Sequence, residues 1–293
     1  MERREWPGKR ILQKLVPFQW RAVGARFLLY EIPFHFWRYT AGRKARLERP
    51  IFMIGCPRSG TTLSAKLFSF HPDVASWSEA GEIWDPRHHR NPEADHYWTA
   101  AEVTPRDAAR LHARFEYHRR FWRKERFFNK NPRSSVRLDY IRAIFSDAVF
   151  LHVVRDGRAV VASMQEFGRR GRRRSVAFPF VRPAGWRELI RDDKVEQQAL
   201  QWRAIVSYIL DKRRELGSRY HEIRYEDLCE EPRRVLGAAY RFAGLRADEA
   251  TLARLPEQLS SQNYKWKSQF SAEQIEKINR IQESLLQALG YPL

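Results

Sequence analysis

From residue 50 onward, short apolar runs alternate with stretches in which apolar residues recur at helical spacing. The run IFMIG, residues 51–55, follows a proline and ends in a glycine, and is typical of a strand buried on both faces. The next stretch, TTLSAKLFSF, places Leu63, Leu67 and Phe70 at helical spacing, and a His-Pro pair ends it. This pattern predicts a strand, a tight loop and a helix.

The same pattern recurs later in the chain. The buried run AVFLHVV, residues 148–154, leads into RDGRAVVASMQEF, which predicts a second strand and helix. RFF at 126–128 and YHEIRY at 220–225 predict two further strands, and residues 195–216 a helix. Near the C-terminus, the S-x-x-Q capping box of Ser271 and Gln274 predicts the start of another helix. Together these elements predict an α/β fold of three layers, with a central parallel sheet flanked by helices.

Composition limits the number of domains and the compartment. The 293 residues are 43% hydrophobic and 13% aromatic, which suits one domain with a full core. We expect residues 1–49 to form a basic, aromatic-rich N-terminal extension and residues 50–293 to form a single domain. Cys56 and Cys229 provide neither a disulfide framework nor a metal-ligand spacing, which favours a reducing, cytoplasmic location. We expect no signal peptide, because charged residues interrupt every apolar stretch near the N-terminus. We expect no transmembrane helix, because no apolar run reaches about 20 residues.

The charge of the chain is strongly positive, at +19, and this favours acidic partners. Residues 1–49 hold twelve Lys and Arg against four Asp and Glu, interleaved with aromatic residues. Two interpretations of this extension are open. It is either an amphipathic segment that lies on an anionic membrane, with the protein peripheral at the inner membrane surface, or a helix packed on the core with solvated arginines.

A glycine-bounded loop, IGCPRSGTT, follows the first predicted strand. It resembles the phosphate loop G-x-x-x-x-G-K-[ST], except that Thr61 stands in place of the lysine and Arg58 lies three residues earlier. Backbone N–H groups at the start of the next helix would still converge on an anion. Such a P-loop-like cradle suits a sulfuryl group, which carries less charge than a triphosphate and needs no bridging metal. The alternative is an ordinary Gly-rich turn without a ligand.

A second motif, VVRDGRAVVASM, strengthens the interpretation as a ligand site. It places Arg155 at the carboxyl end of a buried strand, and Ser163 about two helical turns later. Ligands bind at the carboxyl edge of parallel sheets. The sequence therefore predicts a second phosphate-binding site beside the first.

Together, PRSGTTL and FLHVVRDGRAVVASM resemble the paired donor-binding motifs of sulfotransferases that use 3′-phosphoadenosine 5′-phosphosulfate (PAPS). HPDVASWSE, FFNKNP, RYEDL followed by PRRVL, and the final KW and LGYPL are similar to segments of the tyrosylprotein sulfotransferase branch and its bacterial relatives. The similarity runs from about residue 50 to the end. It implies a sulfotransferase domain over 50–293, PAPS as donor, adenosine 3′,5′-bisphosphate (PAP) as product, and no required metal.

The resemblance assigns roles to residues near the sulfuryl group. It implies that Arg58 contacts that group, and that the 5′-phosphate is held by the residues at the helix start: Ser59, Gly60, Thr61 and Thr62. Glu79 matches the catalytic glutamate that would accept the acceptor's proton, with Glu82 as its rival. Lys130, in FFNKNP, matches a lysine that assists the leaving group.

Other residues match the positions that hold the rest of the donor. Arg155 and Ser163 are expected at the 3′-phosphate, with Tyr225 near it and Lys265 closing from the C-terminal segment. Phe167 departs from the branch, which carries an arginine there. The arginine-rich run 169–174 is either a substitute for that charge or a solvated loop.

Two other classes of function remain as alternatives. One is a P-loop kinase or NTPase, against which the missing lysine counts, and the other is a basic protein that binds membrane surfaces or nucleic acid. The acceptor is not readable from the sequence: a hydroxyl or amine of a glycan, glycolipid, small molecule or peptide would fit, whereas no specific nucleic acid is expected. We expect its specificity to lie in the insertions at 85–125 and 168–193.

Overall fold

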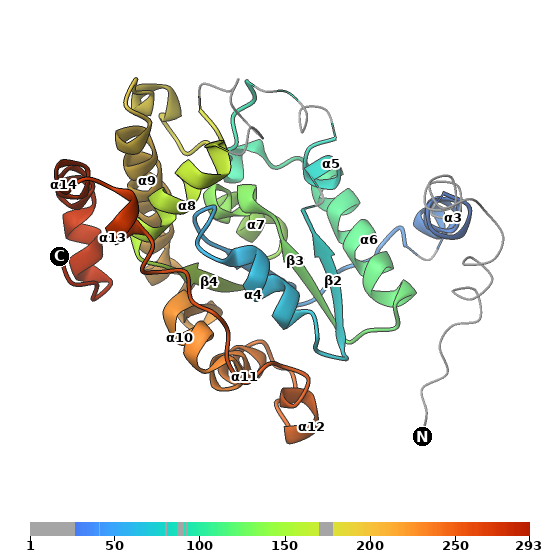
Figure 1. Ribbon diagram of the computed structural model, residues 1–293. Coiled ribbons are helices and arrows are strands. Elements are labelled where there is room, and N and C mark those ends of the chain that lie inside the picture. Colours follow the sequence, from blue (N-terminus) through green and yellow to red (C-terminus); the bar gives the residue numbers. More distant parts are fainter. Residues whose placement is uncertain (1–26, 41, 80, 87–90, 92, 170–177) are drawn as a thin grey trace.

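The computed structural model describes residues 27–40, 42–79, 81–86, 91, 93–169 and 178–293. Its centre is a parallel sheet of five strands in the order β2-β3-β1-β4-β5 (Figure 1). The strands are β1 Ile51–Ile54, β2 Val74–Ser78, β3 Arg126–Lys130, β4 Val149–Val154 and β5 Tyr220–Arg224. The prediction of an α/β fold with a central parallel sheet is confirmed.

Helices connect the strands and cover both faces of the sheet (Figure 1). The α-helices of the described residues are α3 Ile32–Tyr39, α4 Thr61–Phe68, α5 Gly81–Trp84, α6 Pro105–Phe121, α7 Leu138–Ile144, α8 Gly157–Arg169, α9 Lys194–Leu216, α10 Tyr225–Glu230, α11 Pro232–Phe242, α12 Glu249–Leu252, α13 Trp266–Gln269 and α14 Ala272–Ala288. The short π- and 3₁₀-helical turns are η1 Phe27–Glu31, η2 Ala100–Glu102, η3 Pro132–Val136, η4 Trp186–Leu189 and η5 Gly217–Arg219.

The side chains of β1 point alternately into two hydrophobic cores, one on each face of the sheet. Phe52 and Ile54 point to one face, where α6, α7 and α9 pack, whereas Ile51 and Met53 point to the other, where α4 and α11 pack. All four residues are fully or almost fully buried, as expected for a parallel strand covered on both sides. The result is the predicted three-layer arrangement.

Most of the predicted elements are present, and one strand was missed. The capping box is confirmed, because the Ser271 hydroxyl accepts from the Gln274 N–H while the Gln274 side chain accepts from the Ser271 N–H. The edge strand β2, VASWS, was not predicted, since only its first two residues are buried and its small polar residues do not form an apolar run. No helix among the described residues is long and apolar enough to cross a membrane.

Candidate active site

Each of the five strands leads at its carboxyl end into a residue or loop that the sequence nominated. Parallel strands bring all these ends to one edge of the sheet. The nominated groups are Glu79 after β2, Lys130 as the last residue of β3, the loop Gly55–Gly60 after β1, Arg155 after β4 and Tyr225 after β5. Residues spread over more than half of the chain therefore contribute to one region.

The loop after β1 is held in its conformation from both ends. The Ser135 hydroxyl accepts from the Gly55 N–H at 2.9 Å and donates to the Gly55 carbonyl at 2.8 Å. At the other end, Gly60 precedes α4 with a φ of +93°, a conformation that favours glycine. Arg58, between them, has a φ of +74°, which is rare for a residue with a side chain. The first N–H groups of α4 have no acceptors within their own helix, so they provide an anion cradle.

Gly60, in the loop after β1, lies against Tyr225, the residue that follows β5. A Cβ atom at this position would lie 2.4 Å from the ring of Tyr225. The guanidinium of Arg155 stacks on the same ring, 4.3 Å from its centroid. Burial raises the pKa of Tyr225, so its hydroxyl stays protonated at neutral pH. The ring of Tyr225 therefore lies close to both Gly60 and the Arg155 guanidinium.

Arg58 and Arg155 are brought together, as the paired motifs predicted. Arg155 donates to the Arg58 carbonyl at 3.1 Å, and Arg58 Nε donates to the Ser163 hydroxyl at 3.2 Å. The guanidinium of Arg58 also lies 5.0 Å from the ring centroid of Phe167. Phe167 thus contacts the loop arginine at the position where the resembling branch carries another cation.

Two residues that the sequence did not nominate complete the surroundings of Arg155. Asn263 accepts from Arg155 Nε at 2.9 Å and donates to the Glu226 carboxylate at 2.8 Å. Glu226 also accepts from the Asp156 N–H and from the Tyr291 hydroxyl. Glu226 lies within the recognised RYEDL segment, whereas Asn263, two residues before the recognised KW pair, had no signal of its own. The C-terminal segment is thereby connected to the Arg155 region.

Lys130 and Glu79 form the second part of the site. Lys130 is 2% exposed, and its ammonium donates to Glu79 Oε1 at 2.5 Å and to the Thr62 hydroxyl at 3.1 Å. The Glu79 N–H donates to the Lys130 carbonyl at 2.7 Å, and Glu79 has a φ of +54°. A buried cation, an exposed carboxylate and a loop hydroxyl thus lie in contact. Glu82, the rival of Glu79, lies exposed on the short helix α5.

The remaining nominated residues are less closely connected. Lys265 is exposed just before α13, and its ammonium forms no ion pair with a described residue. Ser59 and Thr61 are buried at the loop, whereas Thr62 is exposed. Of the arginine-rich run, Arg169 is the last residue of α8, and residues 170–174 lie outside the described residues.

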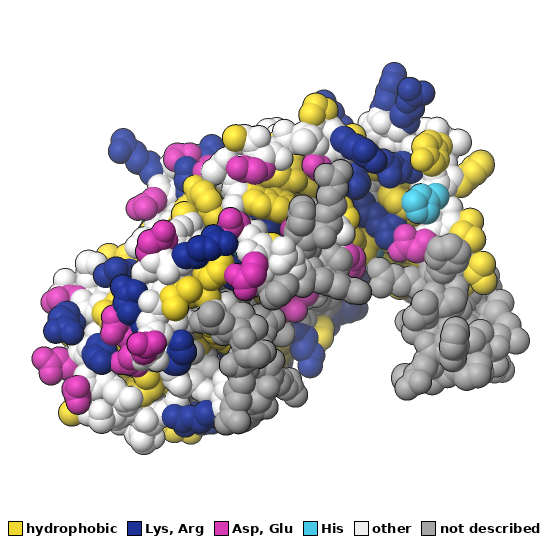
Figure 2. All heavy atoms as spheres, turned by 90° about the horizontal axis from the view of Figure 1, so that it is seen from above, with side chains coloured by type: hydrophobic (Ala, Val, Ile, Leu, Met, Phe, Trp, Pro, Cys, Tyr) yellow, Lys and Arg dark blue, Asp and Glu magenta, His cyan; other side chains and the backbone are white. Residues whose placement is uncertain are grey.

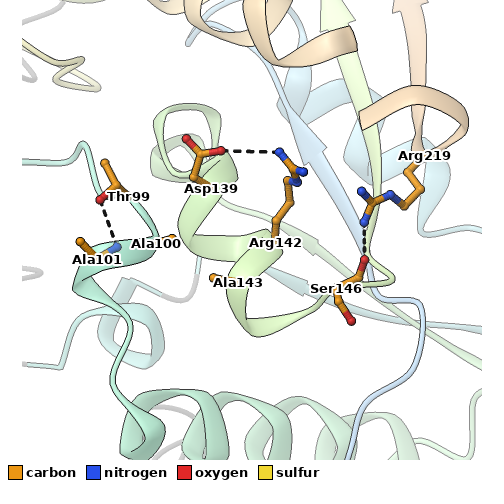
Figure 3. Close-up of a pocket in the computed structure, with 8 residues that line it drawn as sticks. All are labelled: Thr99, Ala100, Ala101, Asp139, Arg142, Ala143, Ser146 and Arg219. Carbon is orange, nitrogen blue, oxygen red and sulfur yellow. Dashed lines mark hydrogen bonds and ion pairs between the residues drawn. The ribbon is translucent and has the colours of Figure 1, made fainter. Parts of the chain in front are cut away.

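A cavity of about 550 Å³ lies elsewhere in the molecule (Figure 3). Two of its residues, Ser146 and Arg219, precede β4 and β5, so the cavity lies at the amino end of these strands. Arg142 pairs there with Asp139 at 3.6 Å, and Arg219 donates to the Ser146 carbonyl (Figure 3). Its cations are therefore already engaged by this chain, on the side of the sheet away from the nominated residues.

Comparison with known proteins identifies a family. Residues 50–249 match the model described as Sulfotransferase family. The omega-hydroxy-beta-dihydromenaquinone-9 sulfotransferase Stf3 of Mycobacterium bovis is 28% identical over 69% of this chain and 51% of its own length. Protein-tyrosine sulfotransferase 1 of Danio rerio is 25% identical over 69% of this chain and 55% of its own length. The chain thus spans about half the length of these curated relatives.

Solved structures share the fold. The sulfotransferase domain of the Synechococcus PCC 7002 olefin synthase matches with a TM-score of 0.55 and 20% identity, over 85% of this chain and 97% of that one. The mouse sulfotransferase SULT7A1, solved in complex with PAP, matches with a TM-score of 0.50 and 12% identity, over 84% of this chain and 87% of that one.

Proposed function

The chain belongs to the sulfotransferase family, and from that premise we propose that it transfers the sulfuryl group of PAPS to a hydroxyl or amine of an acceptor. The observation that carries this proposal is the convergence of Arg58, Lys130 and Arg155 with the loop before α4 at one edge of the sheet. These groups provide positive charge at two places, as a donor with a 5′-phosphosulfate and a 3′-phosphate requires. A mouse family member was solved with PAP, which supports the same donor here.

The residues present fit such a donor. The N–H groups at the start of α4, together with the Thr61 and Thr62 hydroxyls, would hold the 5′-phosphate. Arg155 and Ser163 would hold the 3′-phosphate, and Tyr225 would support the Arg155 guanidinium from its ring face. Lys265, exposed beside these groups in the chain segment that carries Asn263, would close on the donor.

The proposed mechanism is an in-line displacement, in which the bound donor supplies an electrophilic sulfur and a stable leaving group. Glu79 accepts the proton of the acceptor hydroxyl as the new S–O bond forms. Arg58 and Lys130 stabilise the charge that develops on the oxygen of the breaking bond. Lys130 contacts Glu79, so an ammonium that turned toward an anionic group of the bound donor would leave the Glu79 carboxylate free to act as base.

Glu79→Gln tests the base directly, because the amide keeps the shape of the side chain but cannot accept the proton. We expect PAP to bind as in the wild type, while transfer of label from PAPS to a panel of hydroxylated acceptors falls by about 10²- to 10⁴-fold. Glu82→Gln is the matched control and is expected to keep turnover. Near-wild-type turnover of Glu79→Gln would refute the assignment.

The 3′-phosphate site has its own test. Arg155→Ala should weaken the binding of PAP while leaving the affinity for an analogue without the 3′-phosphate little changed. Equal losses for both ligands would remove Arg155 from that role. Protection against thermal unfolding by Mg-ATP, with none from PAP, would instead favour a kinase-like phosphotransferase.

A further inference from the structure

The N-terminal helical segment, η1 and α3, has two apolar faces. Tyr30 and Phe34 are buried against α6. On the opposite face, large apolar side chains recur every three or four residues with high exposure: Leu28 at 61%, Ile32 at 47%, Phe36 at 75% and Tyr39 at 77%. We call these four residues the outer face. A helix that is apolar on both faces needs a partner on each.

The opposite face, which carries Tyr30 and Phe34, is held against α6 by several contacts. The Arg114 guanidinium of α6 lies 4.2 Å from the ring centroid of Phe34 and 5.1 Å from that of Tyr30, and it pairs with Glu31 at 2.5 Å. The Tyr30 hydroxyl contacts His118 Nδ1 at 3.0 Å. These contacts fix the orientation of the outer face relative to the sheet.

The attachment extends to the strand that precedes Glu79. Trp77 of β2 stacks on His118 with ring centroids 4.4 Å apart, and it also meets the edge of the Tyr30 ring. A single residue, Ser78, separates Trp77 from Glu79 in the chain. Whatever binds the outer face is therefore connected through side-chain packing to the β2 edge of the candidate active site.

Positive charge accompanies the outer face. Arg43 and Lys44, just after α3, are exposed and form no ion pair with a described residue. Figure 2 shows yellow apolar side chains next to dark-blue Lys and Arg side chains on the lobe at the right, which carries α3. Exposed apolar residues beside cations complement a bilayer with anionic headgroups. A second copy of the chain fits less well, because a two-fold contact would bring the same cations together.

We propose that the outer face docks on the surface of an anionic lipid bilayer, with Phe36 and Tyr39 inserted at the boundary of headgroups and acyl chains. The docking is inferred from the exposed apolar side chains of the outer face and the cations beside them. Its consequence rests on the proposed function: an acceptor anchored in the bilayer would present its hydroxyl to an enzyme held at a fixed orientation. The relative that acts on a hydroxylated menaquinone agrees with an acceptor of this kind.

The test is sedimentation of the full chain with vesicles of phosphatidylcholine, alone or mixed with phosphatidylglycerol. The wild type should bind the mixed vesicles, and Phe36→Ser with Tyr39→Ser should weaken that binding by at least about tenfold. The control, Phe70→Ser with Leu293→Ser, removes two exposed apolar side chains elsewhere and should bind like the wild type. Arg43→Glu with Lys44→Glu should weaken binding to the mixed vesicles, in a manner that depends on salt.

Three results would overturn the proposal. They are a wild type that does not bind mixed vesicles, an outer-face variant that binds them equally well, and a wild-type dimer that the outer-face variant converts to monomer. PAP binding in the absence of vesicles separates this proposal from the proposed function. Outer-face variants that no longer bind vesicles but still bind PAP would support docking. A wild type that binds vesicles but has no affinity for PAP would support docking and refute the donor assignment.

Discussion

Replacing Gly60 by alanine should damage both the fold and the proposed donor site, for two separable reasons. An alanine at a φ of +93° costs about 1 to 2 kcal/mol, because its Cβ crowds the backbone in the left-handed region. In addition, the Cβ would lie 2.4 Å from the Tyr225 ring, and such overpacking typically costs about 1 to 3 kcal/mol. We expect a total loss of about 2 to 5 kcal/mol in the free energy of unfolding.

A matched glycine isolates the contact with Tyr225 from the backbone penalty. Gly290 has a φ of +70°, yet a Cβ there meets nothing within 4 Å. Gly290→Ala should therefore lose only the backbone contribution, about 1 to 2 kcal/mol in urea-induced unfolding. Gly60→Ala should also lose PAP affinity, measured by calorimetric titration, because displacement of the ring disturbs the arginine stacked on it.

The reasoning fails if Gly60→Ala is no less stable than Gly290→Ala and binds PAP like the wild type. Tyr225→Leu in the Gly60→Ala background provides a further check, since the smaller side chain should recover part of the lost stability. A double variant without any recovery would show that the ring is not the source of the cost.

Two further predictions concern the C-terminal segment and the core. Asn263→Ala removes the contacts with Arg155 and Glu226, so PAP affinity should fall roughly tenfold by calorimetry, whereas Gln262→Ala should change it little. Burial lowers the pKa of His152 to about 3, so below pH 6.5 the unfolded chain takes up a proton that the folded chain refuses, and stability is lost as the pH falls. The loss from this residue should reach about 2 kcal/mol at pH 5 in urea unfolding, and His152→Gln should flatten that slope; identical slopes would exclude the explanation.

The sequence predicted those parts of the fold in which local pattern and burial agree. β1 and β4 are short apolar runs buried on both faces, and the loop between β1 and α4 carries its glycines at fixed spacing. Prediction was harder where burial depends on distant partners. In α6, the buried Arg114 and His118 look like surface residues until Glu31 and Tyr30 are seen beside them.

The candidate site follows the same division. The strand-end residues Lys130 and Arg155 were nominated because each lies within a motif at the end of an apolar run, and the structure brings them to the same sheet edge. Asn263 was missed because it meets Arg155 across 108 residues of sequence, a contact set by the path of the C-terminal segment. No local pattern encodes such a path.

The assembly of the site from the ends of five different strands also determines how activity should respond to partial unfolding. No single hairpin or loop contains all the candidate site residues, so the loss of any strand removes at least one of them. Activity and sheet structure should therefore be lost at the same denaturant concentration. No intermediate concentration should give a partly unfolded protein that is still active. By the same coupling, a ligand bound across the strand ends acts as a clamp on the whole sheet, and it should slow proteolysis at sites far from where it binds.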